Sequence, residues 1–162
     1  MATNAVGEER KHWGVLPVMD GRMLAAIAKQ SEDAGLEGMF SPQVFGPPFL
    51  PLAAATAVTE RIKLASGIAI AAARSPTETA MAALDMDRLS NGRFVLGLGS
   101  SVSAWTSGIF GTPPIKPLTH LKETVSAVRH VIAGAHEHLE PFEGEYFSAD
   151  FREMAKTQPP VR

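Results

Sequence analysis

The chain has 162 residues and a formal net charge of −2, and it contains no cysteine. The length fits one domain with its own core, and 45% hydrophobic with 20% charged residues is typical of a soluble globular protein. The charge balance argues against nucleic-acid binding driven by phosphate contacts. The absence of cysteine excludes disulfides, thiolate catalysis and cysteine-ligated zinc.

No membrane-targeting signal is evident, and we expect a cytoplasmic protein without a membrane partner. The first 13 residues lack the apolar stretch of a signal peptide. The longest run of small and apolar residues, 64–73, has about half the length needed to span a bilayer.

The first third of the chain alternates strand and helix patterns. Residues 13–19 predict a strand and residues 21–35 a helix, for which Gly35 is a plausible C-terminal stop. A short second strand is expected at 36–41. A second helix, which opens with proline, is expected at 48–60.

The next unit contains the clearest helix start in the chain. Residues 61–71 predict one strand that is almost continuously apolar, as strands buried on both faces tend to be. Residues 75–92 predict the helix that follows. Ser75 can cap it, Pro76 suits its first position, and Glu78 would complete a capping box.

A glycine-rich strand follows, and then a long loop and a long helix. The strand is predicted at 93–99, with sequence RFVLGLG, and the loop rich in glycine and proline at 100–117. Residues 118–134 predict an amphipathic helix, and a hairpin is expected around 143–144. The predicted apolar face of the helix consists of Leu118, Leu121, Val125, Val128 and Ile132.

Four consecutive strand–helix units predict an α/β fold with a parallel sheet and right-handed crossovers. Four units can form an open doubly wound sheet or half of an eight-stranded barrel. Periodicity alone leaves both architectures open.

The glycine-rich turn after the fourth strand does not match a dinucleotide-binding fingerprint. That motif needs G-x-G-x-x-G followed at once by a helix. Gly97 and Gly99 are present, but Val102 occupies the third glycine position and a proline-rich loop delays the helix. The alternative is a purely structural role, in which the two glycines only allow the strand and the loop to pack closely.

Several motifs in order resemble the luciferase-like monooxygenase superfamily, above all its branch that uses the deazaflavin coenzyme F-420. They are ERIKLASGIAI (60–70), RSP (74–76), LSNGRFVLGLGS (89–100) and FEGEYF (142–147). The resemblance covers about residues 20–147. It implies a (β/α)8 TIM-type barrel, of which a single luciferase-like domain at 1–162 would hold the first four units and stop before the expected fifth strand.

The resemblance also implies where a coenzyme, either F-420 or FMN, would bind. In the family the ring lies at the C-terminal ends of the strands, and a non-prolyl cis peptide closes the third strand behind it; Gly67–Ile68 matches that position. Small residues after the fourth strand would let a flat ring approach the backbone. The cofactor-contacting residues so implied are Ser66, Gly67, Ile68, Gly99, Ser100 and Ser101.

No catalytic residue and no metal site is identified. In the loop at 41–49, Gln43 is the polar side chain with reach, and histidine is absent there, so a proton-transfer role for this loop is doubtful. His136, His138, Glu140 and Glu143 lie close together, but their spacing fits no ligand frame, and a solvated loop is the better interpretation.

The sequence is therefore compatible with two functions. The first is an oxidoreductase that transfers a hydride or oxygen between a flavin or deazaflavin and a small organic substrate. The second is a truncated non-catalytic remnant, or a half-barrel assembly module, that binds no cofactor. A half-barrel exposes two strand edges and an apolar inner face, so a homo-oligomer is expected.

Overall fold

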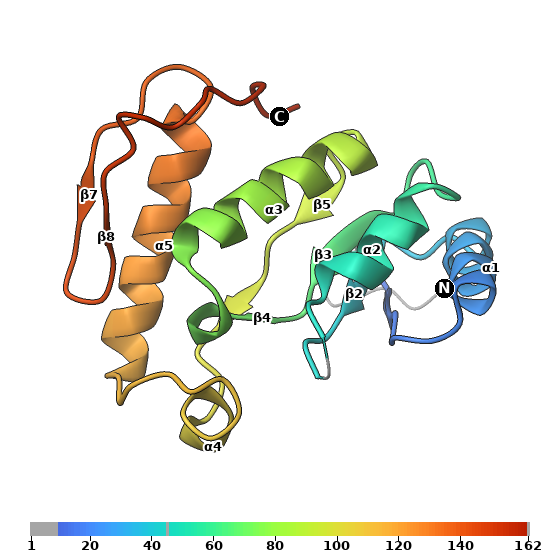
Figure 1. Cartoon of the computed structure of the whole chain (residues 1–162). Helices are drawn as coiled ribbons and strands as arrows, with labels where there is room; N and C mark the ends of the chain where they lie inside the picture. The colour runs from blue at the N-terminus through green and yellow to red at the C-terminus, as the bar shows by residue number, and fades with distance from the viewer. Residues whose placement is uncertain (1–9, 45, 162) are drawn as a thin grey trace.

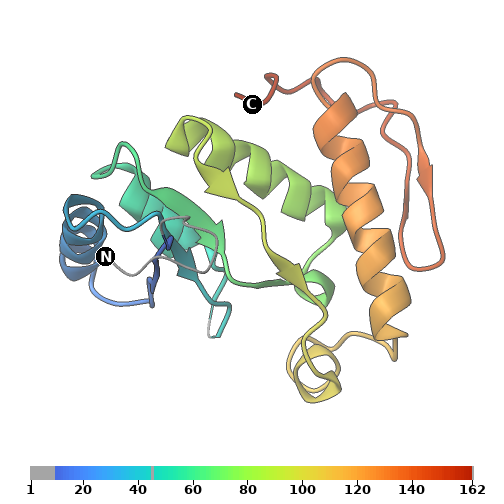
Figure 2. The same ribbon diagram turned by 180° about the vertical axis from the view of Figure 1, so that it is seen from behind.

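The computed structural model describes residues 10–44 and 46–161. Four of the strands in these residues form a parallel sheet in the middle of the molecule, with α1 at one end and α5 beside a small hairpin at the other (Figure 1). The view from behind shows the same order, with α3 between the sheet and α5 (Figure 2). The expected α/β class with a parallel sheet is confirmed.

The first two units are β1 (Trp13–Val15), α1 (Gly21–Asp33), β2 (Gly38–Ser41) and α2 (Phe49–Thr56). They lie where the sequence predicted them, with shorter boundaries. The Asp20 side chain caps α1 by accepting hydrogen bonds from the backbone N–H groups of residues 22 and 23, at 3.0 and 3.4 Å.

The apolar run expected as one strand is two strands in two different sheets. They are β3 (Lys63–Ser66) and β4 (Ala69–Ile70), and β4 continues into the short helix η1 (Ala71–Ala73). The prediction of a continuous strand at 61–71 was wrong. An unbroken apolar run shows burial but not the point at which a strand changes its pairing partner.

The third long helix, α3 (Pro76–Ser90), begins and ends as predicted. Ser75 Oγ accepts the N–H of Glu78 at 3.1 Å, and Asn91 ends the helix with φ at 55°. The second half of the predicted capping box differs, because the Glu78 carboxylate lies 3.9 Å from Nε of Arg74.

The glycine-rich strand is also split, into β5 (Phe94–Val95) and β6 (Leu98–Gly99). The loop after it contains a short helix that the sequence did not indicate, α4 (Ser103–Thr106). The long helix α5 (Pro117–Gly134) follows.

The predicted apolar face of α5 was partly wrong. Val128 is buried, but Leu118 is 65% exposed. The buried residues of α5 are Thr124, Ala127, Val128 and Val131. The buried face is therefore rotated from the predicted one, and α3 packs along α5.

The expected hairpin is confirmed as β7 (Phe142–Glu143) paired antiparallel with β8 (Ser148–Ala149). A carboxylate on α5 fixes its turn. Glu123 accepts backbone hydrogen bonds from residues 145, 146 and 147 at 2.7 to 2.8 Å. The FEGEYF motif therefore anchors the hairpin to α5.

The main sheet has the order β1-β2-β3-β5, and β4 pairs with β6 beyond its carboxyl end. One face of the main sheet packs on the helices, where Met39 and Leu64 are 1% and 0% exposed. On the other face, Val15 of β1 and Val95 of β5 are 52% and 45% exposed. The sheet is thus buried on its helix side and open on the other.

Candidate functional site

The residues that the resemblance singled out meet at the carboxyl end of the sheet. β3 ends at Ser66, and the peptide bond between Gly67 and Ile68 is cis, at the position expected. β4 then pairs in parallel with β6, so that Ile70 lies opposite Gly99. The two strands predicted at 61–71 and 93–99 are consequently interrupted side by side, the first between β3 and β4 and the second between β5 and β6.

Ser66 joins the two interrupted strands. Its hydroxyl donates to the carbonyl oxygen of Gly97 and accepts from the N–H of Gly97, both at 2.9 Å. The residue is only 2% exposed. This side chain therefore positions the neighbouring strand, and its predicted contact with a coenzyme stays a prediction.

Close packing explains both glycines of the GLG segment. A Cβ atom added to Gly97 would lie 2.2 Å from the carbonyl oxygen of Ser66, and one added to Gly99 would lie 2.9 Å from Cδ1 of Ile68. Neither position can hold a larger side chain without a shift of its neighbour. The apolar side chain of Ile68 remains 38% exposed at this end of the sheet.

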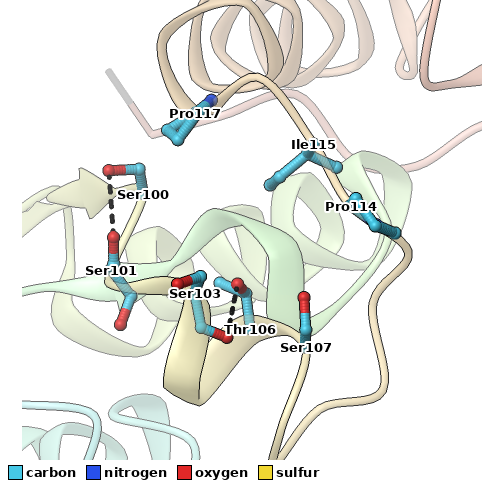
Figure 3. Close-up of a pocket in the computed structure, with 8 residues that line it drawn as sticks. All are labelled: Ser100, Ser101, Ser103, Thr106, Ser107, Pro114, Ile115 and Pro117. Carbon is cyan, nitrogen blue, oxygen red and sulfur yellow. Dashed lines mark hydrogen bonds between the residues drawn. The ribbon is translucent and has the colours of Figure 1, made fainter.

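A cavity of about 270 Å³ lies just after β6 (Figure 3). Its wall carries hydroxyl groups from the end of β6 and from α4, and it faces a proline-rich segment that leads into α5. Ser101 has a positive φ of 59°, and Ser100 Oγ donates to its carbonyl oxygen at 3.4 Å. The lining residues are Ser100, Ser101, Ser103, Thr106, Ser107, Pro114, Ile115 and Pro117.

Two polar side chains, Gln43 after β2 and Arg74 after β4, are hydrogen-bonded to each other. Gln43 Oε1 accepts hydrogen bonds from the backbone N–H of Ile70 at 2.9 Å and from Nη1 and Nη2 of Arg74 at 3.2 and 3.3 Å. The sequence singled out Gln43 but missed Arg74, because the RSP motif was interpreted only as a helix opening. The burial of Arg74 lowers the pKa of its guanidinium, and the nearby Glu78 carboxylate acts in the opposite direction.

The first residues of the same two strand motifs lie at the opposite, amino end of the sheet. Arg93 donates from Nη1 to the carbonyl oxygen of Ile62 at 2.8 Å and from Nη2 to that of Thr59 at 3.0 Å. Glu32 accepts N–H bonds from residues 60, 61 and 62 at 2.6 to 3.0 Å. These groups hold the chain that enters β3, so they support the fold and lie away from the candidate site.

The histidine-rich segment after α5 forms local pairs. His138 Nε2 lies 2.8 Å from Glu140 Oε1, and both side chains are more than 70% exposed. Within residues 10–44 and 46–161, no group of three or more histidine, cysteine, aspartate or glutamate side chains could hold a metal ion.

The sequence matches the family model of the luciferase-like monooxygenases over residues 3–162. A Mycobacterium tuberculosis protein whose name proposes a coenzyme F-420-dependent oxidoreductase is 37% identical over 129 residues, which cover 79% of this chain and 36% of that protein. The chain therefore belongs to the luciferase-like monooxygenase family, as the motifs predicted.

Two solved structures show a similar fold. The coenzyme F-420-dependent tetrahydromethanopterin reductase of Methanopyrus kandleri matches with a TM-score of 0.78 and 22% identity, over 93% of this chain and 47% of the reductase. The oxygenating constituent of 3,6-diketocamphane monooxygenase from Pseudomonas putida, in complex with FMN, matches with 0.75 and 18%, over 92% and 48%. The chain thus spans about a third to a half of the length of these proteins.

In the part of the chain that the structure describes, no helix combines the length and the apolar character that crossing a membrane requires.

Proposed function

We propose that this chain forms part of a flavin- or deazaflavin-dependent oxidoreductase and binds the coenzyme ring at the carboxyl end of its sheet. The observation that carries the proposal is the meeting of the two strand interruptions, which brings Ile68 beside Gly99. The half-exposed Ile68 side chain offers the ring an apolar surface. Beyond it, Ser100 and Ser101 offer partly exposed polar groups.

Different residues of this chain would contact different parts of the coenzyme. Gly67, Ile68 and Gly99 would lie against the ring, Ser66 would fix the distance between the strands, and the serine-lined cavity would take a polar part of the coenzyme or substrate. The bound coenzyme would supply the hydride or oxygen chemistry. The substrate would be a small organic molecule.

The test is coenzyme binding followed by fluorescence and absorbance, with FMN and coenzyme F-420 titrated separately into the full chain. Ile68→Ala should weaken binding about tenfold, because it removes roughly 1 to 2 kcal/mol of apolar contact. Leu89→Ala is the control, since Leu89 is 58% exposed near the other end of α3. Absence of binding to both coenzymes, or equal losses in both variants, would contradict the proposal.

A second candidate, a half-barrel assembly module that binds no coenzyme, is favoured by the open face of the sheet. Val15 and Val95 are about half exposed and lie on β1 and β5, the two outer strands. Outer strands with free backbone groups and apolar side chains promote association. We expect light scattering to show a homo-oligomer that Val95→Lys dissociates, whereas Leu50→Lys on the exposed side of α2 does not. A monomeric unmodified chain would rule out this candidate.

A further inference from the structure

We propose that Arg74 and Gln43 form a binding site for an oxyanion, a carboxylate or a phosphate group, at the carboxyl end of the sheet. The site adjoins the ring-binding residues above, since the N–H of Gln43 donates to the carbonyl oxygen of Ile68 at 3.2 Å, but it contains none of them and does not depend on the identity of the coenzyme. It rests on the burial of a cation, on the small number of acceptors that compensate its charge, and on the cavity that it lines.

The Arg74 guanidinium is held in place away from water. Its side chain is 9% exposed, and its Cζ lies 5.3 Å from the centre of the Phe49 ring. A buried charge is costly unless opposite charge or several hydrogen bonds compensate it. Stacking on an aromatic face recovers part of this cost but leaves the edge of the guanidinium free to bind.

The groups that contact the Arg74 guanidinium supply little negative charge. Among the described residues, its hydrogen-bond acceptor is the neutral oxygen of Gln43. The carboxylate of Glu78 lies 3.9 Å from Nε, beyond hydrogen-bond distance, and its side chain is 67% exposed. An arginine carries five N–H donors, so donors remain for a ligand.

Gln43 adds a donor to the same place. Its Oε1 atom already accepts three N–H groups, from Ile70 and Arg74. This arrangement fixes the carboxamide, and its Nε2 group carries two further N–H donors in a residue that lines the same cavity as Arg74. A fixed amide donor beside a guanidinium suits an oxyanion, which accepts several hydrogen bonds at once.

A cavity of about 310 Å³ gives access to this pair. Its wall comes from the loop after β2, from the start of α3 with the residues before it, and from Phe110 in the loop after α4. α3 begins two residues after Arg74 and runs for 15 residues, so the positive end of its dipole lies nearby. The lining residues are Gln43, Gly46, Pro47, Ala73, Arg74, Glu78 and Phe110.

The experiment titrates inorganic phosphate and acetate into the full chain and measures binding by calorimetry. Arg74→Met removes the charge but keeps a stem to pack on Phe49, and it should weaken binding of the better probe at least tenfold. Arg88→Met is the matched control, since Arg88 lies on α3 beside Asp85 and outside the cavity. Equal binding in all three proteins, or no binding of either probe, would overturn the proposal.

A second variant keeps the proposal testable if Arg74→Met does not fold. Glu78→Gln removes the carboxylate that competes for Arg74 and should tighten binding about twofold to fivefold. Unchanged or weaker binding in this variant would also overturn the proposal.

A comparison of FMN with riboflavin identifies the source of the oxyanion. If Arg74→Met weakens FMN but not riboflavin, the site takes the coenzyme phosphate. If neither flavin is affected while acetate binding is lost, the site takes a substrate carboxylate. Both results support the oxyanion site.

Discussion

Glu32 should be one of the most important polar groups for stability, and Glu32→Gln tests this. Its side chain is 2% exposed, and Oε2 accepts N–H bonds from residues 60, 61 and 62. Burial alone raises the pKa of a carboxyl, but these three bonds outweigh it and hold the pKa of Glu32 at about 2. The bonds therefore favour the charged form strongly.

The size of the effect follows from this pKa. A decrease from the ordinary 4.5 to about 2 favours the charged form on folding by about 3 kcal/mol, at about 1.4 kcal/mol per pH unit. Glutamine keeps one acceptor but loses the charge, and its amide would lie near the ammonium of Lys29. We expect Glu32→Gln to lower the free energy of unfolding by about 2 to 4 kcal/mol at pH 7.

The assay is urea unfolding followed by circular dichroism, with Asp33→Asn as the control. Asp33 shares the partner Lys29 at 2.9 Å but is 57% exposed, so its loss should cost less than about 1 kcal/mol. Because the folded pKa of Glu32 is depressed, its contribution is complete above pH 4.5 and is lost as the pH falls towards 2. Equal destabilisation by both substitutions at pH 7, or a Glu32→Gln deficit as large at pH 3 as at pH 7, would refute this reasoning.

Five further substitutions, in three experiments, test the packing and the contact that holds the hairpin, and each is measured by urea unfolding. Gly97→Ala places a methyl group 2.2 Å from a backbone carbonyl oxygen and should cost about 2 to 3 kcal/mol or more, whereas Gly21→Ala meets no atom within 4 Å and should cost nothing; equal effects would contradict the close approach. Glu123→Gln should cost about 1 to 3 kcal/mol and speed hydrogen exchange at the turn amides; unchanged exchange there would show that the carboxylate does not hold the hairpin. Leu118→Ala should be nearly neutral and Val131→Ala should cost about 2 kcal/mol, and the reverse order would restore the face of α5 predicted from sequence.

Local signals in the sequence were sufficient for the order of elements and for several helix ends. Ser75 and Asn91 lie within a few residues of the backbone groups that they affect, so the start and the end of α3 could be predicted from neighbouring residues alone. The alternation of strand and helix likewise predicted the parallel sheet, because parallel strands need crossovers.

Contacts between distant residues could not be predicted in this way. Glu32 binds backbone groups 28 to 30 residues away, and Arg74 binds Gln43 across 31 residues. A side chain gives no sign in the sequence of which distant partner it will meet. The split between β3 and β4 was missed for the same reason, since the break depends on a second strand, β6.

The segment that forms the candidate site also lies at the boundary of two hydrophobic clusters. One contains Leu64 and lies where α1 and α2 pack on the main sheet, and the other contains Val131 and lies where α3 packs against α5. Leu96 and Leu98 pack against both clusters. Helix α3 also joins them, because Met86 belongs to the first cluster and Leu84 to the second, so we expect the two halves of the structure to unfold together. Gly99 directly follows Leu98, so we expect a ligand bound at Gly99 to slow hydrogen exchange in both clusters rather than only in the nearer one.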